Sequence, residues 1–425
     1  MPEKISKRRF WKYLAAGLVI AVAAAAGGGY YFSGSETVRR PYSRQKMPDY
    51  WKGIMFVNWL LENSRYVDLG MSELSRRIPA NIVALWVPFY TDHPDSDRIF
   101  TIYDSKQYGK AYYGMFQMDE SWPPDLIGKT LDLAHRLGFQ VAYWPNVGPV
   151  TQAQAWEGAL NPTPAVFKAY REFKAEQAAL AEKHQCEMFW IGNEWNKSYI
   201  YGEEWRKILE AVRNNFSGAI LVEFLYQGEW EWKRILEKVD PSCFELMDYM
   251  GLSMILFPMS PDYSGIEPCD PSNYSPTVLQ LVERWQRPAK AIEEAYKKFK
   301  KPIFITELAA YSYDGGACEE WRRNPLALKR AVDFQEQADL FEAAMRVLTA
   351  LDCVHGVSWN KWNAYEPGLF SSWTEHSKRE TQFQGKPAEK VLKYWYSKKN
   401  IRDGIGLPLT PDGHVDLKKL DSLVG

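Results

Sequence analysis

Residues 189–195 read Phe-Trp-Ile-Gly-Asn-Glu-Trp, a short apolar run that leads directly into an amide and a carboxylate. Residues 302–308, Pro-Ile-Phe-Ile-Thr-Glu-Leu, repeat this arrangement and again end in one Glu. Apolar runs of this length, flanked by longer amphipathic stretches, are typical of buried parallel β-strands. Glu194 and Glu307 are therefore predicted to lie at the carboxyl ends of two strands.

Eight such runs alternate with amphipathic stretches along the chain. They are Gly53–Val57, Asn81–Val87, Phe139–Tyr143, Glu187–Ile191, Ala219–Phe224, Tyr249–Ile255, Pro302–Thr306 and Val354–Ser358. Helix signals support this order, because Pro124 and Pro164 each open an amphipathic stretch between two runs. Eight strands, each followed by a helix, predict an α/β fold, a single (β/α)8 TIM barrel. The two glutamates then follow the fourth and the seventh strands.

The N-terminus is predicted to be an export segment, residues 1–32. Five basic residues precede an uncharged stretch from Tyr13 to Phe32, which is long enough to cross a bilayer. The segment is either cleaved or kept as a membrane anchor, so the remainder is expected to be extracellular, secreted or attached to the outer face of the cytoplasmic membrane. Residues 6–12, Ser-Lys-Arg-Arg-Phe-Trp-Lys, resemble a twin-arginine export motif with Lys7 in place of the first Arg.

Three further segments follow from the sequence pattern. Residues 33–50 are polar and predict a linker, residues 51–400 the barrel domain, and residues 401–425 a C-terminal tail without regular periodicity. Five cysteines without a Cys-x-x-Cys pair argue against a thiolate metal site. In an exported protein Cys269 and Cys318, in loops after strands six and seven, are predicted to form a disulfide.

Composition excludes several classes of function. The chain has 52 Lys plus Arg and 53 Asp plus Glu, a formal net charge of −1, so no broad basic surface is available for a nucleic acid. Phosphate-binding, dinucleotide-binding and nucleophilic-serine motifs are absent from the sequence. We expect no metal, no cofactor and no nucleic-acid partner.

The pair of strand-end glutamates indicates glycoside hydrolysis. That reaction needs one carboxylic acid to protonate the leaving oxygen and one carboxylate to attack the sugar or to activate water. A single Glu at a strand end more often caps a helix or forms an ion pair. Two of them on rigid strand ends at one barrel mouth favour the enzymatic interpretation.

Seven stretches resemble glycoside hydrolase family 113, whose characterised members are mainly β-mannanases. They are IGNEW at 191–195, EEWRKILEAVRNNFSGAI at 203–220, FELMDYMGLS at 244–253, KPIFITELAAYS at 301–312, the helix at 337–348, GVSWNKW at 356–362 and GKPAEKVL at 385–392. The resemblance implies a retaining hydrolase whose substrate partner is a β-glycan, above all β-1,4-mannan or glucomannan. Two alternatives stay open: a hydrolase of another β-glycan, such as a cellulose-like or mixed-linkage glucan, and a barrel that binds cell-surface glycan without catalysis.

The resemblance also implies roles for single residues. Glu194 would be the acid/base, Glu307 the nucleophile, and Asn193 the donor to the sugar 2-hydroxyl. Trp359, at the end of the eighth strand, would stack under the sugar at the cleavage point. Trp195, Trp144 and Asn58, near other strand ends, are also predicted to bind substrate.

Two features remain ambiguous in the sequence. Relatives commonly have Tyr near the end of strand six, able to hydrogen-bond the nucleophile, whereas the hydroxyl here is that of Ser253, so Tyr263 or Tyr311 is expected to replace it. Glu223, inside the fifth run, faces either the barrel lumen or a helix. A retaining pair requires its carboxyl groups to be about 5 Å apart.

Overall fold

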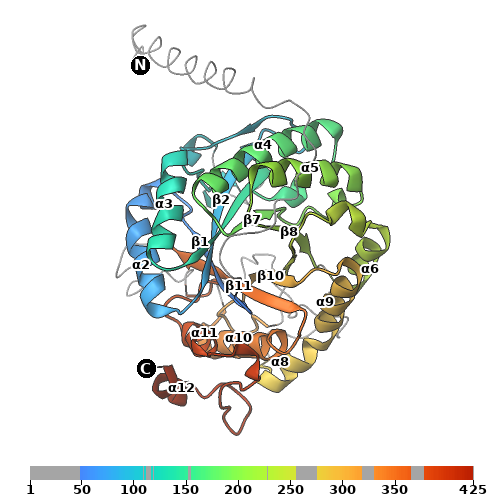
Figure 1. Cartoon of the computed structure of the whole chain (residues 1–425). Helices are drawn as coiled ribbons and strands as arrows, with labels where there is room; N and C mark the ends of the chain where they lie inside the picture. Colours follow the sequence, from blue (N-terminus) through green and yellow to red (C-terminus); the bar gives the residue numbers. More distant parts are fainter. Residues whose placement is uncertain are drawn as a thin grey trace. The chain divides into compact units, whose positions relative to one another are not determined.

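The computed structural model describes residues 48–108, 110–111, 116–117, 119–151, 155–226, 228–254, 275–317, 330–364 and 378–424. Its central feature is a closed barrel of parallel strands (Figure 1). The strands are β1 (Trp51–Val57), β2 (Ile82–Thr91), β6 (Gln140–Pro149), β7 (Met188–Ile191), β8 (Ala219–Leu225), β9 (Tyr249–Ser253), β10 (Ile303–Leu308) and β11 (Val354–Asn363). Because β1 pairs with both β2 and β11, the eight parallel strands close on themselves, and β3 is added to β2 outside this closure. The predicted (β/α)8 TIM barrel is confirmed.

Helices surround the strands, and two of them begin at Pro124 and Pro164, where the sequence signals placed them. The helices are α2 (Val67–Arg77), α3 (Pro124–Arg136), α4 (Pro164–Lys183), α5 (Gly202–Asn215), α6 (Glu229–Lys238), α8 (Val278–Arg284), α9 (Gln286–Phe299), α10 (Phe334–Leu348), α11 (Pro387–Ser397) and α12 (Leu417–Val424). Proline is the first residue of α3, α4 and α11, where its missing N–H has no helical partner to lose. Thr163 caps α4 by accepting a 3.3 Å hydrogen bond from the Val166 amide.

Short elements decorate the connections. The small strands are β3 (Ile99–Phe100), β4 (Lys110–Ala111) and β5 (Phe116–Gln117). The 3-10 segments are η1 (Leu61–Tyr66), η2 (Ser105–Tyr108), η3 (Glu157–Ala159), η4 (Asn196–Ser198), η5 (Pro241–Phe244) and η8 (Ile401–Asp403). Of these, η3 and η4 follow β6 and β7 and lie at the carboxyl end of the barrel, which is the end that carries active sites in this fold.

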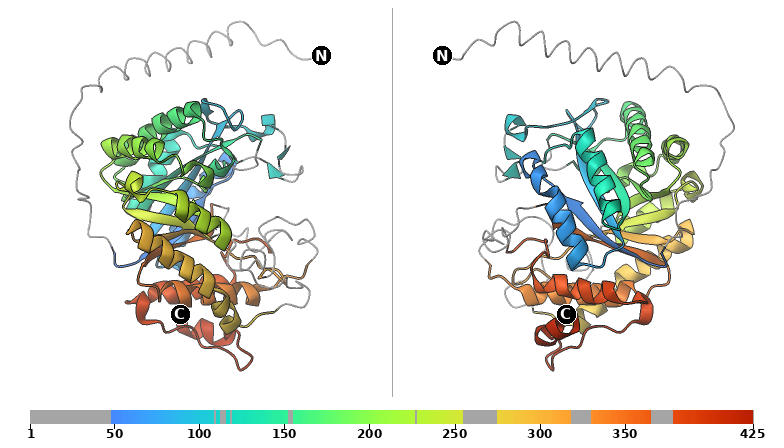
Figure 2. Two further views of the ribbon diagram at one scale, coloured as in Figure 1. Left: turned by 90° about the vertical axis from the view of Figure 1, so that its right-hand side faces the viewer. Right: turned by 60° about the vertical axis from the view of Figure 1, so that its left-hand side comes forward.

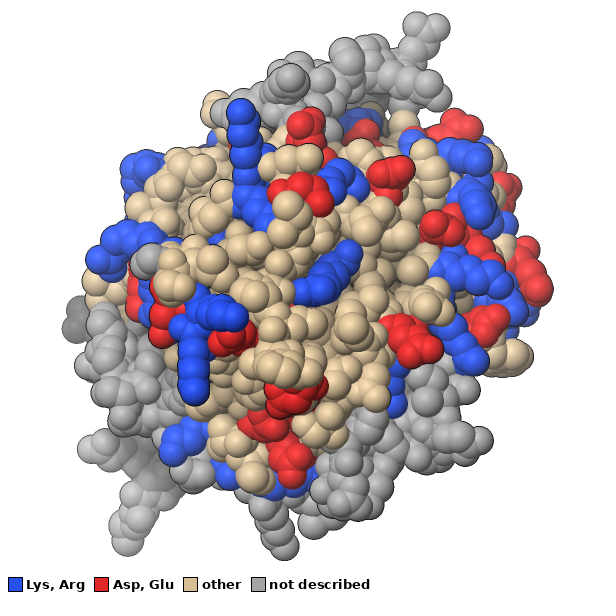
Figure 3. Space-filling view, turned by 90° about the horizontal axis from the view of Figure 1, so that it is seen from below, with Lys and Arg blue, Asp and Glu red and all other residues tan. Residues whose placement is uncertain are grey.

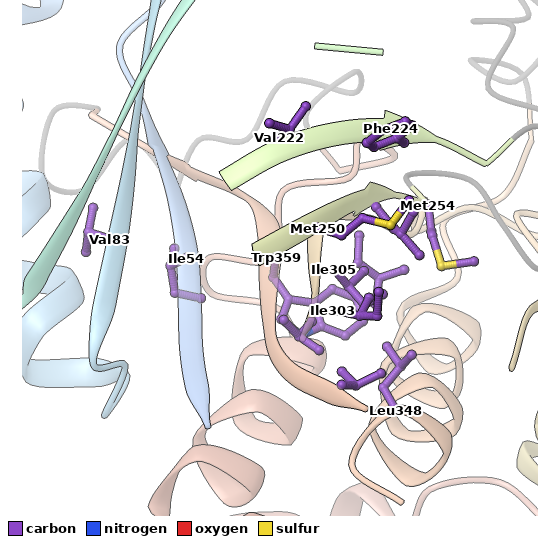
Figure 4. Close-up of a cluster of buried hydrophobic side chains, with 14 of the residues drawn as sticks. Ile54, Val83, Val222, Phe224, Met250, Met254, Ile303, Ile305, Leu348 and Trp359 are labelled. Atoms are coloured by element: carbon purple, nitrogen blue, oxygen red, sulfur yellow. The ribbon is translucent and has the colours of Figure 1, made fainter. Parts of the chain in front are cut away.

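Alternation along each strand builds two hydrophobic cores. On β10, Phe304 joins the lumen core, whereas Ile303 and Ile305 join the core between strands and helices. Figure 4 shows part of this outer core, with Ile303, Ile305 and Trp359 close to Leu348 of α10. The lumen core is filled mainly by side chains from the strands, among them Trp51, Trp86, Trp144, Trp190, Leu221, Tyr249 and Phe304. The barrel centre is therefore packed, and polar side chains are concentrated towards its carboxyl end.

The C-terminal tail differs from the irregular segment that the sequence suggested. Residues Leu417–Val424 form helix α12, which packs against α11 (Figure 2). Buried carboxylates of α10 hold the tail, because Asp339 Oδ1 accepts from the Val415 amide and Glu342 Oε1 from the Leu407 amide, both at 2.7 Å.

The face seen from below Figure 1 carries basic and acidic side chains that are interspersed, and neither sign forms a continuous field (Figure 3).

Several predictions fall outside the described residues. These are the export segment 1–32, most of the linker 33–50, Tyr263, and the predicted disulfide between Cys269 and Cys318. They remain predictions. In the described ranges, every helix is too short or too polar to cross a membrane.

Candidate active site

The turn that follows β7 presents Glu194 at the carboxyl end of the barrel. Gly192 has φ +88° and Glu194 has φ +62°, so both adopt the left-handed conformation. A Cβ on Gly192 would lie 3.0 Å from the Tyr199 hydroxyl and 3.1 Å from the Glu223 carbonyl, so glycine is required there. Residues other than glycine rarely adopt this conformation, and those that do cluster at functional sites. The backbone of Glu194 is thus held in a strained form by its surroundings.

Both carboxyl oxygens of Glu194 accept a hydrogen bond. Ser253, the last residue of β9, donates to Oε1 at 2.6 Å, and the Trp156 indole N–H donates to Oε2 at 2.8 Å. Burial raises the pKa of Glu194 above its ordinary value, and the hydrogen bonds from Ser253 and Trp156 oppose that rise. A carboxyl whose pKa is raised by burial suits a general acid.

Glu307, on β10, lies in the same electrostatic cluster and is 7% exposed. Burial raises the pKa of its carboxyl well above the ordinary value, and the charge on Glu194 raises it further. Lys361 of β11 acts in the opposite direction by favouring the ionised form. Of the charges that act on the Glu307 carboxyl, that of Lys361 is the positive one. Two buried carboxyls that affect one another titrate as a pair.

Ser253 does not replace the missing tyrosine at the nucleophile position. Its hydroxyl bonds Glu194 instead of Glu307. Tyr311, the other described candidate, packs its ring 5.2 Å from that of Tyr313. Tyr263 lies outside the described residues, so a hydroxyl donor to Glu307 stays a prediction.

The two predicted asparagines lie at strand ends of the same barrel face. Asn193 is 7% exposed, and its carbonyl accepts a 3.1 Å hydrogen bond from the Gly158 amide. Asn58 follows β1 and is 2% exposed, with neither amide atom of its side chain paired. Asn146 on β6, which the sequence analysis did not single out, buries its side-chain amide in the same way. Buried amides normally find a partner, so two unpaired ones at one barrel end are typical of a binding site.

The three predicted tryptophans are buried, which does not fit the sugar stacking predicted for Trp359 or the substrate contacts predicted for Trp195 and Trp144. Trp359 is 1% exposed and stacks on Phe341 of α10, with ring centroids 3.7 Å apart. Trp195 is fully buried and donates its indole N–H to the Leu160 carbonyl at 2.8 Å. Trp144 is fully buried in the lumen, where its N–H bonds the Gly192 carbonyl at 3.1 Å and supports the Glu194 turn.

Sequence reasoning missed the direct partners of the two glutamates. Trp156 lies 38 positions from Glu194, and no periodic pattern marks it. Lys361 belongs to the stretch GVSWNKW at 356–362, in which only Trp359 was predicted to contact the substrate. Alternation along the strand could have indicated which side chains face the lumen, but it does not distinguish Lys361 from other residues of the same strand.

Glu223 faces the lumen, which settles the earlier ambiguity. On β8 it follows Ala219 and Leu221 in the alternation that fills the lumen core. It is fully buried and neither carboxyl oxygen has a hydrogen-bond partner. Burial raises the pKa of Glu223 well above its ordinary value, and the charges on Glu307 and Glu194 add to that effect. A third carboxyl therefore lies beside the pair, in surroundings that favour its protonated form.

Outside this site, one cluster of three carboxylates has a spacing that could hold a metal ion. Oxygens of Asp314, Asp333 and Glu336 lie within 4.8 Å of one another. However, both oxygens of Glu336 accept backbone hydrogen bonds, from Gly315 at 2.9 Å and from Ala317 at 2.6 Å. These contacts give the group a structural role in holding the loop after β10.

Comparison with known proteins identifies the family. The sequence profile of Glycoside Hydrolase Family 113 matches residues 116–386, a range that contains both Glu194 and Glu307. The chain belongs to glycoside hydrolase family 113. It is therefore a glycoside hydrolase, and the family resemblance seen in the sequence is confirmed. A comparison with curated protein sequences gave no match.

Solved structures of family 113 share the fold. The β-mannanase AaManA from Alicyclobacillus acidocaldarius, in complex with ManMIm, is 21% identical over 82% of this chain and 98% of that chain, with a TM-score of 0.61. Another structure, a GH113 β-1,4-mannanase, is 20% identical over 83% of this chain and 100% of that chain, with a TM-score of 0.62. At these identities the similarity establishes the barrel architecture.

Proposed function

We propose that the protein hydrolyses β-1,4-linked mannan or glucomannan with retention of configuration, with Glu194 as acid/base and Glu307 as nucleophile. One observation carries the proposal. In a family 113 barrel, carboxyls from the ends of β7 and β10 lie in one buried cluster in which the charge of Glu194 raises the pKa of Glu307. The choice of mannan is supported by the similar solved structures, which are of β-mannanases.

The proposed chemistry has two steps. Glu307 attacks the anomeric carbon while Glu194 gives its proton to the departing glycosidic oxygen, so a sugar–Glu307 ester forms and the glycosidic bond breaks. Water then attacks the same carbon while Glu194 takes up its proton, and the ester bond breaks. In the free protein the mutual repulsion of the two carboxyls favours a single proton on the pair. The proposed roles require that proton on Glu194, and the positive charge of Lys361 favours the ionised form of Glu307. Loss of the Glu307 charge in the ester lets Glu194 ionise and act as base.

Product analysis on purified linear β-mannan, glucomannan and cellulose, side by side, tests substrate class and reaction together. We expect shortened mannan or glucomannan chains and, by proton NMR at early times, products that first appear as the β-anomer. Faster hydrolysis of cellulose would overturn the choice of mannan. An α-anomer as first product would overturn the retaining mechanism. Glycan binding without hydrolysis on any of the three would favour a non-catalytic barrel.

We also propose that the protein acts outside the cytoplasmic membrane. The support is the basic start of the chain followed by the uncharged stretch Tyr13–Phe32. Fractionation of the host cell should find the protein in the medium, in a compartment outside that membrane, or attached to the membrane's outer face. Full-length protein soluble in the cytoplasm would refute export.

A further inference from the structure

The indole of Trp156 is fixed against Glu194 by close backbone contacts. Trp156 is half-buried and immediately precedes η3, in the connection that follows β6. A Cβ on Gly158 would lie only 2.4 Å from the Trp156 ring, so the ring rests directly on the Gly158 backbone. The Gly158 amide in turn bonds the Asn193 carbonyl at 3.1 Å. The segment that carries Trp156 is thus bonded to the turn that carries Glu194.

A buried charged cluster anchors this segment from below. Glu157 and Lys174 of α4 are both fully buried, with Glu157 Oε1 2.8 Å from Lys174 Nζ. The other oxygen, Oε2, accepts from the Tyr170 hydroxyl at 2.7 Å. That hydroxyl also accepts from the Gly192 amide at 3.1 Å. The cluster therefore connects the residue after Trp156 to the residue two before Glu194.

The type of donor matters for a group that must give and take a proton. An indole N–H donates only, so the lone pair of Glu194 Oε2 that faces Trp156 can never carry the mobile proton. A serine hydroxyl can donate or accept, so Ser253 adapts to either protonation state of Glu194. Trp156 thereby restricts the mobile proton to the remaining lone pairs of the carboxyl. This restriction fixes the orientation of the acid.

We propose that Trp156 is a positioning residue for the acid/base: its indole N–H holds one oxygen of Glu194, and the Glu157–Lys174–Tyr170 cluster holds Trp156 in the place from which it does so. The proposal rests on the proposed role of Glu194. Besides Trp156 and Ser253, the groups that face Glu194 electrostatically are Glu223 of β8, Glu307 of β10 and Tyr199, which follows η4. Substitution of Trp156 by Phe leaves all of these in place.

The test compares Trp156→Phe with a matched control, Trp232→Phe. Trp232 on α6 is buried more completely than Trp156 and likewise donates its indole N–H, but to the Ala291 carbonyl at 3.1 Å, outside the site. Two readouts are used: the pH profile of kcat/KM on mannan, and titration of Glu194 by carbon-13 NMR, assigned by the signal lost in Glu194→Gln. Loss of the N–H should move the Glu194 titration and the alkaline limb to higher pH by about one unit. Trp232→Phe should move neither.

The anchoring cluster is tested with Tyr170→Phe, which removes one oxygen and no charge. We expect a smaller shift in the same direction, and no additional shift when it is combined with Trp156→Phe, because both changes act through one contact. An unchanged Glu194 titration in Trp156→Phe, or fully additive shifts in the double variant, would overturn the proposal. The NMR titration needs no turnover. Failure of the proposed hydrolysis would appear separately, as a wild-type protein that cleaves none of the glycans.

Discussion

Ser253, the last residue of β9, donates its hydroxyl to Oε1 of Glu194 at 2.6 Å. As a result Glu194 has two donors, whereas Glu307 depends on the charge of Lys361. This distribution determines which substitutions should change the pH dependence of each step.

Ser253→Ala should raise the pH at which Glu194 loses its proton. Removing a hydrogen bond that favours the ionised form raises the pKa of Glu194, so the alkaline limb of kcat/KM should move to higher pH. The base step should slow, with a loss in kcat on the order of tenfold. Steady-state profiles on mannan measure both effects. Ser253→Thr, which retains the hydroxyl, is the control and should resemble the wild type.

Substitution of Glu307 and substitution of Glu194 should have different effects on turnover. Glu307→Ala should abolish turnover on every substrate. Glu194→Ala should still form the ester from aryl glycosides whose leaving group needs no proton, and azide should then restore turnover and give a β-glycosyl azide. Mass spectrometry and NMR of the products distinguish these outcomes. Near-normal rates in Glu307→Ala, or a measured carboxyl separation above about 9 Å, would rule out the retaining assignment.

Lys361→Met should impair catalysis mainly at low pH. Without this positive charge the pKa of Glu307 rises further, and the nucleophile stays protonated to higher pH. The acidic limb of the kcat/KM profile should move to higher pH. On that limb kcat/KM should fall roughly three- to tenfold. Lys361→Arg keeps the charge and should keep the wild-type limb. Equal losses at all pH values in both variants would point to packing on Trp59, whose ring centroid lies 4.8 Å from Lys361 Nζ.

Trp359→Ala should reduce stability more than it reduces activity per folded molecule. Its ring is stacked on Phe341 in the outer core, so truncation leaves a cavity and should cost about 3–5 kcal/mol. Denaturant unfolding measures the loss, and active-site titration normalises the rate. A nearly unchanged midpoint together with a large loss of turnover would restore the sugar-stacking role that the sequence suggested.

Glu336 should make folding stability depend on pH. Burial raises the pKa of its carboxyl from 4.5 to about 8, so the folded state holds a proton that the unfolded chain releases above about pH 4.5. Stability should therefore decline as pH rises towards about 8, at up to about 1.4 kcal/mol per pH unit. Glu336→Gln should flatten this slope, as urea unfolding at several pH values would show. Its absolute stability is a poorer measure, because the change also alters the backbone bonds to Gly315 and Ala317.

The sequence by itself determined the order of strands and helices, because each depends on local periodicity, proline signals and chain length. It also placed Glu194 and Glu307 at one face of the barrel, since parallel strands deliver their carboxyl ends to one face whatever the details of packing. The family could be predicted as well, because the resemblance lies in short local stretches such as residues 191–195 and 301–312. These features need no knowledge of which residues meet across the barrel.

Only the tertiary structure decided how side chains point and what they touch. Trp359 and its neighbours alternate between lumen and helix layer, so a shift of one residue reverses their roles, and apolar runs buried on both sides carry no signal of the direction. The partners of Glu194 come from 38 and 59 positions away along the chain. Such contacts depend on barrel closure and on buried packing around Glu157 and Lys174, which no local stretch of sequence specifies.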